Sequence, residues 1–167
     1  MAEGGRDEER ESLNALFLSN PFYRGMVVLV ILIGRGICGL VFSWTTFSIF
    51  PLSNIIGGVL IIIGFVFHRW AEKDHKMAHE KSRDIDMIVS TGVYSRIRHP
   101  LYLSMIVMNV GIALAFGIMV TFVIALLTSI HWIISSLKEE EALMQKFPRE
   151  YMRYKQEVRW RMIPGVF

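Results

Sequence analysis

Hydrophobic residues are grouped along this chain in long runs, a pattern that predicts helices crossing a membrane. Four stretches are almost entirely apolar: residues 25–48, 52–70, 100–115 and 118–137. Each is close to the ~20 residues that an α-helix needs to span a hydrocarbon core of ~30 Å. Pro51 separates the first two runs, and Phe116 with Gly117 offers a turn between the last two. The sequence therefore predicts an all-α, polytopic membrane protein with about four transmembrane helices.

Charged residues indicate how these helices are oriented. Every Lys and Arg except Arg35 lies before the first run, between the second and third, or after the fourth. The positive-inside rule then places both termini and residues 71–98 in the cytoplasm, at the plasma or inner membrane, or at the endoplasmic reticulum of a eukaryote. Residues 1–20 mix Glu, Asp and Arg and have no short apolar core. We expect them to form a polar lead-in rather than a signal peptide.

The overall composition excludes several classes of protein. Hydrophobic residues make up 53% of the 167 residues and charged residues only 20%, which argues against a water-soluble enzyme. The net charge of +3 lies beside membrane segments, so it does not indicate nucleic-acid binding. A single cysteine cannot form an internal disulfide. His75 and His79 are four residues apart, but no further ligand completes a metal site, and none is predicted.

The cytoplasmic segment before the third run combines aromatic and polar residues. A polar, helix-like stretch over residues 71–83 is followed by a short extended piece and a turn at Ser90-Thr91-Gly92. Pro100 then opens the third helix, because proline is tolerated in a first helical turn. We therefore expect Tyr94, His99 and Tyr102 to collect at one mouth of the helix bundle.

The fourth helix is expected to continue into the cytoplasm through Glu139, Glu140 and Glu141. It should break at Pro148 and resume as an amphipathic helix to about Val158. Apolar and aromatic residues recur at helical spacing there: Leu143, Met144, Phe147, Tyr151, Tyr154 and Val158. This face could lie on the membrane or fold over the mouth of the bundle. Three consecutive glutamates are repelled by an anionic membrane, so we expect at least one carboxylate to face a cation.

Two blocks of sequence on either side of the last two helices carry a family resemblance. The first is Ser-Thr-Gly-Val-Tyr-Ser-Arg-Ile-Arg-His-Pro-Leu-Tyr, and the second is Glu-Glu-Glu-Ala-Leu-Met-Gln-Lys-Phe-Pro-Arg-Glu-Tyr-Met-Arg-Tyr, followed by Ile163-Pro164. Together they resemble the catalytic half of the isoprenylcysteine carboxyl methyltransferase and phospholipid methyltransferase superfamily over residues 79–164. The resemblance implies that residues 21–70 form the first two membrane helices and residues 71–167 form the catalytic half.

The resemblance also implies a cofactor and a site. Members of the superfamily bind S-adenosylmethionine at the cytosolic end of the helices, and a lipophilic acceptor enters from the bilayer. The implied partners are therefore membrane lipids and a lipophilic or prenylated substrate. The positions that match cofactor-contacting residues are His79, Asp86, Met87, Ile88, Val89, Tyr94, His99, Pro100, Leu101, Tyr102 and Glu139.

One departure from the family pattern concerns the acceptor. The prenylcysteine enzymes carry an arginine, assigned to the substrate carboxylate, one helical turn before the cofactor-binding glutamate, whereas this chain has Ser135 there. Arg35 would then supply the charge from the first span. A carboxylate acceptor needs no general base, but an amine acceptor does, and His99, Glu140 and His131 are the candidates. The resemblance thus predicts methylation of an isoprenylcysteine-type carboxylate or, alternatively, of a phospholipid amine.

Other functions fit the sequence less well. A sterol-type membrane reductase shares a similar Arg-His-Pro-x-Tyr motif but is much larger than this chain. A small multidrug transporter needs a carboxylate inside the membrane, and the predicted spans contain neither Asp nor Glu. A non-catalytic membrane scaffold would tolerate the aromatic and acidic segments without requiring them together.

Overall fold

The computed structural model describes residues 21–44, 46, 51–81 and 88–166. Their helices, in chain order, are α2 (Pro21–Val41), α3 (Leu52–Lys81), the short 3₁₀-helix η1 (Gly92–Ser95), α4 (Pro100–Phe116), α5 (Met119–Lys146) and α6 (Pro148–Glu157). Within these ranges the sole extended pairing is an isolated bridge between Thr46 and Ile118. The predicted all-α class is confirmed.

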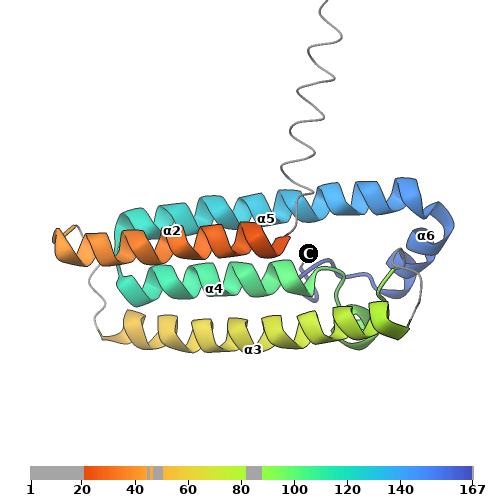
Figure 1. Ribbon diagram of the computed structural model, residues 1–167, viewed down its shortest axis with the longest axis horizontal. Coiled ribbons are helices and arrows are strands. Elements are labelled where there is room, and N and C mark those ends of the chain that lie inside the picture. Colours follow the sequence, from red (N-terminus) through yellow and green to blue (C-terminus); the bar gives the residue numbers. More distant parts are fainter. Residues whose placement is uncertain (1–20, 45, 47–50, 82–87, 167) are drawn as a thin grey trace, which may run out of the picture.

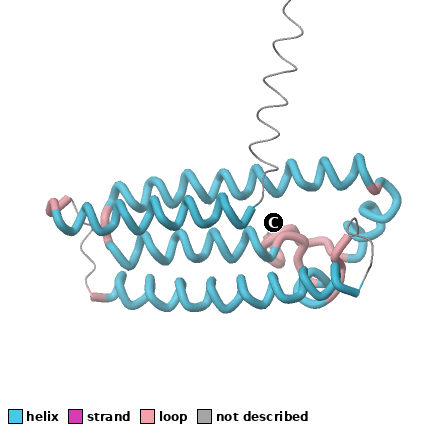
Figure 2. Tube along the Cα trace, in the orientation of Figure 1, coloured by secondary structure: helices cyan, strands magenta, loops and turns pink. Residues whose placement is uncertain are grey.

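Helices α2, α3, α4 and α5 run along the long axis of the molecule, and α4 lies among the others (Figure 1). Helix α4 packs against α2, α3 and α5. The tube view shows η1, α6 and the C-terminal loop gathered at the end where α4 begins (Figure 2). The short uncharged connections lie at the opposite end.

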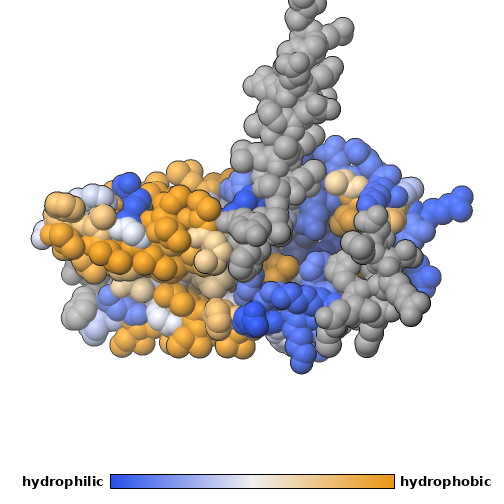
Figure 3. Space-filling model, in the orientation of Figure 1, coloured by the Kyte–Doolittle hydropathy of each residue, from blue (hydrophilic) through white to orange (hydrophobic). Residues whose placement is uncertain are grey.

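Three helices are long and apolar enough to cross a membrane: Arg24–Val41, Leu52–Lys76 and Met119–Lys146. Helix α4 is apolar but has only 17 residues, the lower limit for a span. Large apolar side chains are exposed along α2, α3 and α5, and they form a hydrophobic surface over most of the bundle in Figure 3, with a hydrophilic surface at the end that carries α6. This division is expected of a polytopic membrane protein.

The first helix ends earlier than its hydrophobicity predicts. The apolar run extends to residue 48, but α2 stops at Val41. Ser43 adopts a left-handed conformation with φ of 52°, and the Trp44 N–H donates to the Gly39 carbonyl at 2.9 Å. This is the geometry of a Schellman cap, which closes a helix through backbone hydrogen bonds. Hydropathy does not detect such an ending.

The second apolar run and the polar stretch after it form one continuous helix. Helix α3 extends from Leu52 to Lys81 without a break. Its last three turns therefore continue beyond the apolar part and carry Asp74 and His75 to the end of the bundle where α4 begins. The predicted third and fourth helices and the break at Pro148 match α4, α5 and the start of α6.

Glycines allow α3 and α4 to approach closely. A Cβ atom at Gly57 would clash with the backbone of Ala115 and lie 2.6 Å from the Gly111 carbonyl oxygen. Small residues at helix interfaces permit this kind of backbone contact in membranes. Gly111 takes part in the same contact, whereas a Cβ atom at the neighbouring Gly58 would meet open space.

We predict that Gly57→Ala weakens the bundle and that Gly58→Ala does not. The added methyl group at position 57 overpacks a backbone contact, and the expected loss is about 1–3 kcal/mol of unfolding free energy. Unfolding by SDS in mixed micelles measures this loss. At Gly58 the higher helix propensity of alanine should leave stability unchanged or raise it by about 0.5–1 kcal/mol. Equal effects at both positions would contradict the role given to Gly57.

Candidate functional site

The loop before α4 is joined to the C-terminal segment by backbone hydrogen bonds. The Arg98 N–H donates to the Trp160 carbonyl at 3.0 Å, and the His99 N–H donates to the Arg161 carbonyl at 2.8 Å. His99 is the N-cap of α4, and Pro100 occupies its first turn, where a missing N–H costs no hydrogen bond. The start of α4 is therefore held against the end of the chain.

A buried carboxylate from α5 fastens this junction. Glu140 Oε1 accepts from Arg98 Nε at 3.0 Å and from Arg161 Nε at 2.8 Å, and its Oε2 accepts from Arg161 Nη2 at 3.0 Å. Arg98 also donates to the carbonyls of Val158 and Arg159, each at 2.7 Å. Charge-assisted hydrogen bonds to a buried carboxylate are strong when every partner is satisfied. The Glu140 side chain is only 7% exposed, so this cluster links α5, the loop and the C-terminus.

Hydrogen bonding to Glu140 also raises the pKa of the Arg161 guanidinium. Arginine is already charged throughout the physiological range. The ion cluster on this carboxylate is therefore held in its charged form at any pH at which the protein would work.

A second anchor fixes the turn that carries Tyr94. Asp74, buried on α3, accepts a hydrogen bond from the Val93 N–H at 2.8 Å. Gly92 has a φ of 62°, and a Cβ atom there would clash with the Asp74 carboxylate. Both constraints require glycine at this turn. Asp74 was missed by sequence reasoning, because nothing along the chain connects it with a turn 18 residues later.

Helix α6 folds back over the end of the bundle. The Tyr154 hydroxyl donates to the Tyr94 carbonyl oxygen at 2.7 Å, and Tyr151 is buried beside it. Burial raises the pKa of both phenols, so they remain neutral hydrogen-bond donors. The sequence allowed this aromatic face to lie on the membrane or over the mouth of the bundle. The structure shows it over the mouth.

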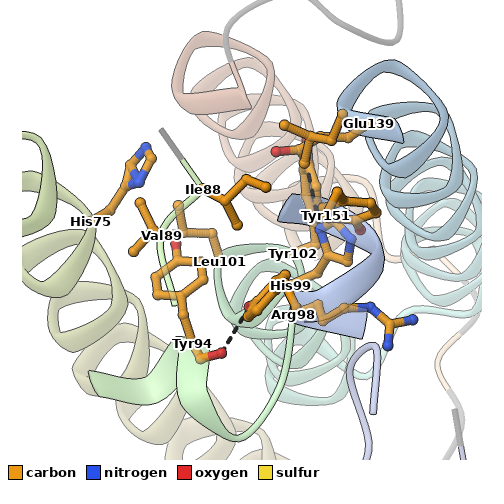
Figure 4. A pocket seen from close by; sticks show the side chains of 12 residues that line it. His75, Ile88, Val89, Tyr94, Arg98, His99, Leu101, Tyr102, Glu139 and Tyr151 are labelled. Atoms are coloured by element: carbon orange, nitrogen blue, oxygen red, sulfur yellow. Dashed lines mark hydrogen bonds and ion pairs between the residues drawn. The ribbon is translucent and has the colours of Figure 1, made fainter. Parts of the chain in front are cut away.

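These contacts enclose a cavity of about 170 Å³. Figure 4 shows His75, Val89 and Tyr94 on one side, with Glu139, Tyr151 and Arg98 across from them. The cavity is lined by residues from α3, the loop, α4, α5 and α6: His75, Ile88, Val89, Tyr94, Arg98, His99, Leu101, Tyr102, Glu139, Leu143, Tyr151 and Tyr154.

Most of the residues implied by the family resemblance lie together here. Seven of them line the cavity: Ile88, Val89, Tyr94, His99, Leu101, Tyr102 and Glu139. Pro100 is buried between two lining residues. Asp86 and Met87 lie outside the described residues, and the same holds for the side chain of His79, whose backbone belongs to α3.

Five lining residues were not among the predicted site residues: His75, Arg98, Leu143, Tyr151 and Tyr154. The helical spacing of Leu143, Tyr151 and Tyr154 predicted an apolar face but not what that face covers. His75 was considered only as a metal ligand, and no pattern indicated that α3 would carry it to this cavity.

Polar groups in the cavity are a carboxylate, an imidazole and phenols. Glu139 is the most accessible acid, with a side chain that is 42% exposed and Oε2 at 3.7 Å from His99 Nδ1. His99 Nε2 lies 3.2 Å from Glu140 Oε1. Burial raises the pKa of the Tyr94 phenol, and the nearby Glu139 carboxylate adds to this effect. The Tyr151 hydroxyl is buried and has no hydrogen-bond partner among the residues that the structure describes.

An aromatic column leads from this cavity into the bundle. The rings of His99 and Tyr102 are 5.6 Å apart, and Tyr102 stacks on Trp132 with a ring separation of 5.6 Å and an interplanar angle of 27°. The guanidinium of Arg24 lies 5.1 Å from the centre of the Trp132 ring. Arg24 Nη1 also donates to Ser135 Oγ at 3.0 Å.

The structure corrects the role expected of Arg35. Its guanidinium lies 5.2 Å from the ring of Trp44, and the neighbouring Gly36 contacts Phe116 at the far end of α4. Arg35 is 11 residues beyond Arg24 on α2, which is roughly 16 Å along the helix. The positive charge that reaches Ser135 from the first span therefore belongs to Arg24.

The structure also corrects the candidate role of Glu140 as a general base. Its carboxylate accepts hydrogen bonds from two arginines, which stabilise the ionised form and make it a poor proton acceptor. Glu140 is also absent from the cavity lining, in contrast to Glu139. Glu140 is thus a structural residue.

The sequence model of the phospholipid methyltransferase family matches residues 52–150, more than half of the chain. This range covers α3, the loop with η1, α4, α5 and the start of α6, and it leaves out α2. A comparison with curated proteins finds no significant match.

We predict that Glu140→Gln strongly destabilises the protein. The neutral amide would leave two buried guanidinium groups without their counter-charge, at an expected cost of about 3–5 kcal/mol. Glu141→Gln is the matched control, because its side chain is 60% exposed and pairs only with Lys138 among the described residues. Its expected effect is below about 0.5 kcal/mol. SDS unfolding in mixed micelles compares the two, and similar stabilities would refute the structural role of Glu140.

Proposed function

Since the chain belongs to the phospholipid methyltransferase family, we propose that it transfers a methyl group from S-adenosylmethionine to a lipophilic acceptor at the cytoplasmic face of a membrane. The family match agrees with the resemblance seen in the sequence and makes the chain a methyltransferase of the phospholipid or isoprenylcysteine type. The identity of the cofactor, the identity of the acceptor and the residues that bind them are what we propose here.

The observation that carries the proposal is that Tyr102 and Glu139 line one cavity. The two residues belong to different helices and are 37 positions apart in the sequence. A cavity that combines an accessible carboxylate with buried aromatic rings is characteristic of a ligand-binding site. Their proximity supports a shared role in binding one molecule.

The chemistry of the lining suits S-adenosylmethionine, which when bound supplies an electrophilic methyl group on a positively charged sulfur. The Glu139 carboxylate would balance a cationic group of the cofactor. The faces of Tyr94 and Tyr102 would accept a sulfonium or an adenine ring. The buried Tyr151 hydroxyl, which has no partner among the described residues, would donate to a polar edge of the ligand.

Transfer from sulfonium requires alignment more than acid–base chemistry. A lone pair of the acceptor forms the new bond to the methyl carbon, the carbon–sulfur bond breaks, and its electron pair remains on sulfur. A carboxylate acceptor completes the reaction without losing a proton. An amine acceptor must lose one, and His99, which lies on the cavity wall, is the candidate base.

We propose an isoprenylcysteine-type carboxylate as the acceptor. Arg24 supports this choice. Helix α5 has Ser135 where the prenylcysteine enzymes have an arginine for the substrate carboxylate, and the Arg24 guanidinium beside Ser135 would supply that positive charge. A phospholipid amine is the second candidate, supported by the description of the matching family.

We predict that the purified protein moves a radiolabelled methyl group from S-adenosylmethionine into lipid-soluble products. Membrane lipid extracts and prenylcysteine analogues serve as acceptors. Mild alkali releases volatile labelled methanol from a methyl ester, whereas the label of a methylated amine stays on nitrogen in a non-volatile product, so one assay separates the two acceptor classes. If no acceptor is labelled, although the cofactor binds, the proposed reaction is refuted.

Binding of the cofactor tests the site independently. We expect Glu139→Gln to weaken binding of S-adenosylmethionine in calorimetry by about tenfold or more, because a charged partner is lost. Glu141→Gln should bind like the wild type, since its side chain points away from the cavity lining. Unchanged affinity in Glu139→Gln would remove this residue from the site.

The distribution of basic residues supports cytoplasmic termini, and labelling of single cysteines tests this orientation. In a Cys38→Ser background we expect Thr46→Cys to react with an impermeant maleimide on intact cells. Glu157→Cys should react only after permeabilisation. Both positions are exposed. Thr46 pairs with Ile118 between α4 and α5, and Glu157 is the last residue of α6, which lies at the other end of the bundle (Figure 1). The reverse pattern of labelling would invert the proposed topology.

A further inference from the structure

A second cavity, of about 160 Å³, lies deeper in the bundle. Tyr102 lines the first cavity, whereas Met105 and Met108 line the second, so the two follow one another along α4 at a distance of roughly one helical turn. The Tyr102 ring stacks on Trp132, and Trp132 belongs to the wall of the second cavity. One aromatic pair therefore separates the two spaces.

The second cavity opens toward the lipid-facing surface between α2 and α3. Met26 on α2 and Phe65 on α3 line it and are 47% and 58% exposed, whereas Met105 and Trp132 are buried. The small Gly25 also lies in its wall, and a Cβ atom there would come within 2.9 Å of the Met105 side chain. An apolar space with an exposed apolar rim inside a membrane is suited to a hydrocarbon chain.

The wall of this cavity is mostly apolar but includes His68, Asn109 and the Arg69–Glu72 ion pair. Two further polar groups lie at its Trp132 side. The Arg24 guanidinium lies 5.1 Å from the Trp132 ring centre. The indole N–H of Trp132 is buried without a hydrogen-bond partner in the described part of the chain. A buried donor of this kind is costly unless an acceptor reaches it. A guanidinium and an N–H donor together favour a ligand oxygen that carries negative charge.

We infer that this cavity receives the hydrocarbon tail of the acceptor and that Arg24 holds an anionic headgroup next to the Tyr102–Trp132 pair. The inference deepens the proposed function and rests on it. It makes Arg24 a specificity-determining residue, although α2 lies outside the residues matched by the family. The anion is either a carboxylate that itself accepts the methyl group or a phosphate beside a methylated amine.

Quenching of tryptophan fluorescence tests the inference without any enzymatic turnover. The probes are dibromostearate, a lysophosphatidate with a dibrominated chain, and the neutral methyl ester of dibromostearate. Bromine quenches an indole that it contacts, and the signal of Trp132 is the part that disappears in Trp132→Phe. We expect saturable quenching of Trp132 by the two anionic probes, at concentrations about tenfold or more below those needed for the ester.

The relative affinity of the two anionic probes distinguishes a carboxylate site from a phosphate site. Tighter binding of dibromostearate supports the carboxylate, and tighter binding of the lysophosphatidate supports the phosphate. Equal affinities support an anion site without preference. Quenching of Trp132 by the ester at the same concentrations as the acids would overturn the inference.

Variants on α2 separate a binding role from a structural one. Arg24→Gln should weaken the anionic probes by about 10- to 100-fold and leave the ester unchanged, while Arg24→Lys should recover part of the affinity. Arg35→Gln is the matched control, because it removes a guanidinium that also faces a tryptophan ring at the other end of the helix. It should not change the affinity of any probe.

Measurements on the same variants distinguish a failure of this inference from a failure of the proposed function. Binding of S-adenosylmethionine to Arg24→Gln should equal that of the wild type, since Arg24 does not line the first cavity. Anion binding that survives Arg24→Gln refutes the anchor, whether or not the cofactor binds. A wild type that takes up neither S-adenosylmethionine nor label refutes the proposed function, whatever the outcome with the lipid probes.

Discussion

The arrangement of the bundle end that carries α6 depends on the buried carboxylate of Glu140. It accepts hydrogen bonds from Arg98 before α4 and from Arg161 near the C-terminus, and so it joins three parts of the chain that are far apart in sequence. A buried ion cluster is costly to desolvate and adds little stability compared with apolar packing. Removing one member, however, strongly destabilises the protein, because it leaves a buried charge without its partner. Its value here is positional, because it holds α6 and the C-terminal loop over the first cavity.

Adjacent glutamates on α5 take opposite roles for a geometric reason. Successive residues on an α-helix point about 100° apart. Glu140 therefore faces the arginines of the junction, while Glu139 faces the cavity. Glu141 is turned to solvent and pairs with Lys138. One short acidic run thus provides a structural anchor, a candidate ligand contact and a solvated residue.

The membrane explains why the chemistry collects at one end. Exposed apolar side chains cover the helices, and a polar group inside the bundle can be satisfied by a neighbouring helix, as Asn109 is by Thr128 at 3.1 Å. Charged groups are costly there, so those needed for a polar ligand lie where the helices leave the bilayer. Arg24 lies near this boundary, with its guanidinium over the ring of Trp132 in the wall of the second cavity.

The amino-acid pattern was sufficient for the all-α class, for the helices at Pro100 and Met119, and for the break at Pro148, because hydropathy and proline act locally. It was also sufficient to name Tyr102 and Glu139 as members of one site, through two motifs in a recognisable order. It placed the end of the first helix wrongly. A backbone cap ends α2 at Val41, and the choice between Arg24 and Arg35 depends on which one α2 brings to Ser135. Such choices follow from distances between helices, and spacing along a chain does not contain those distances.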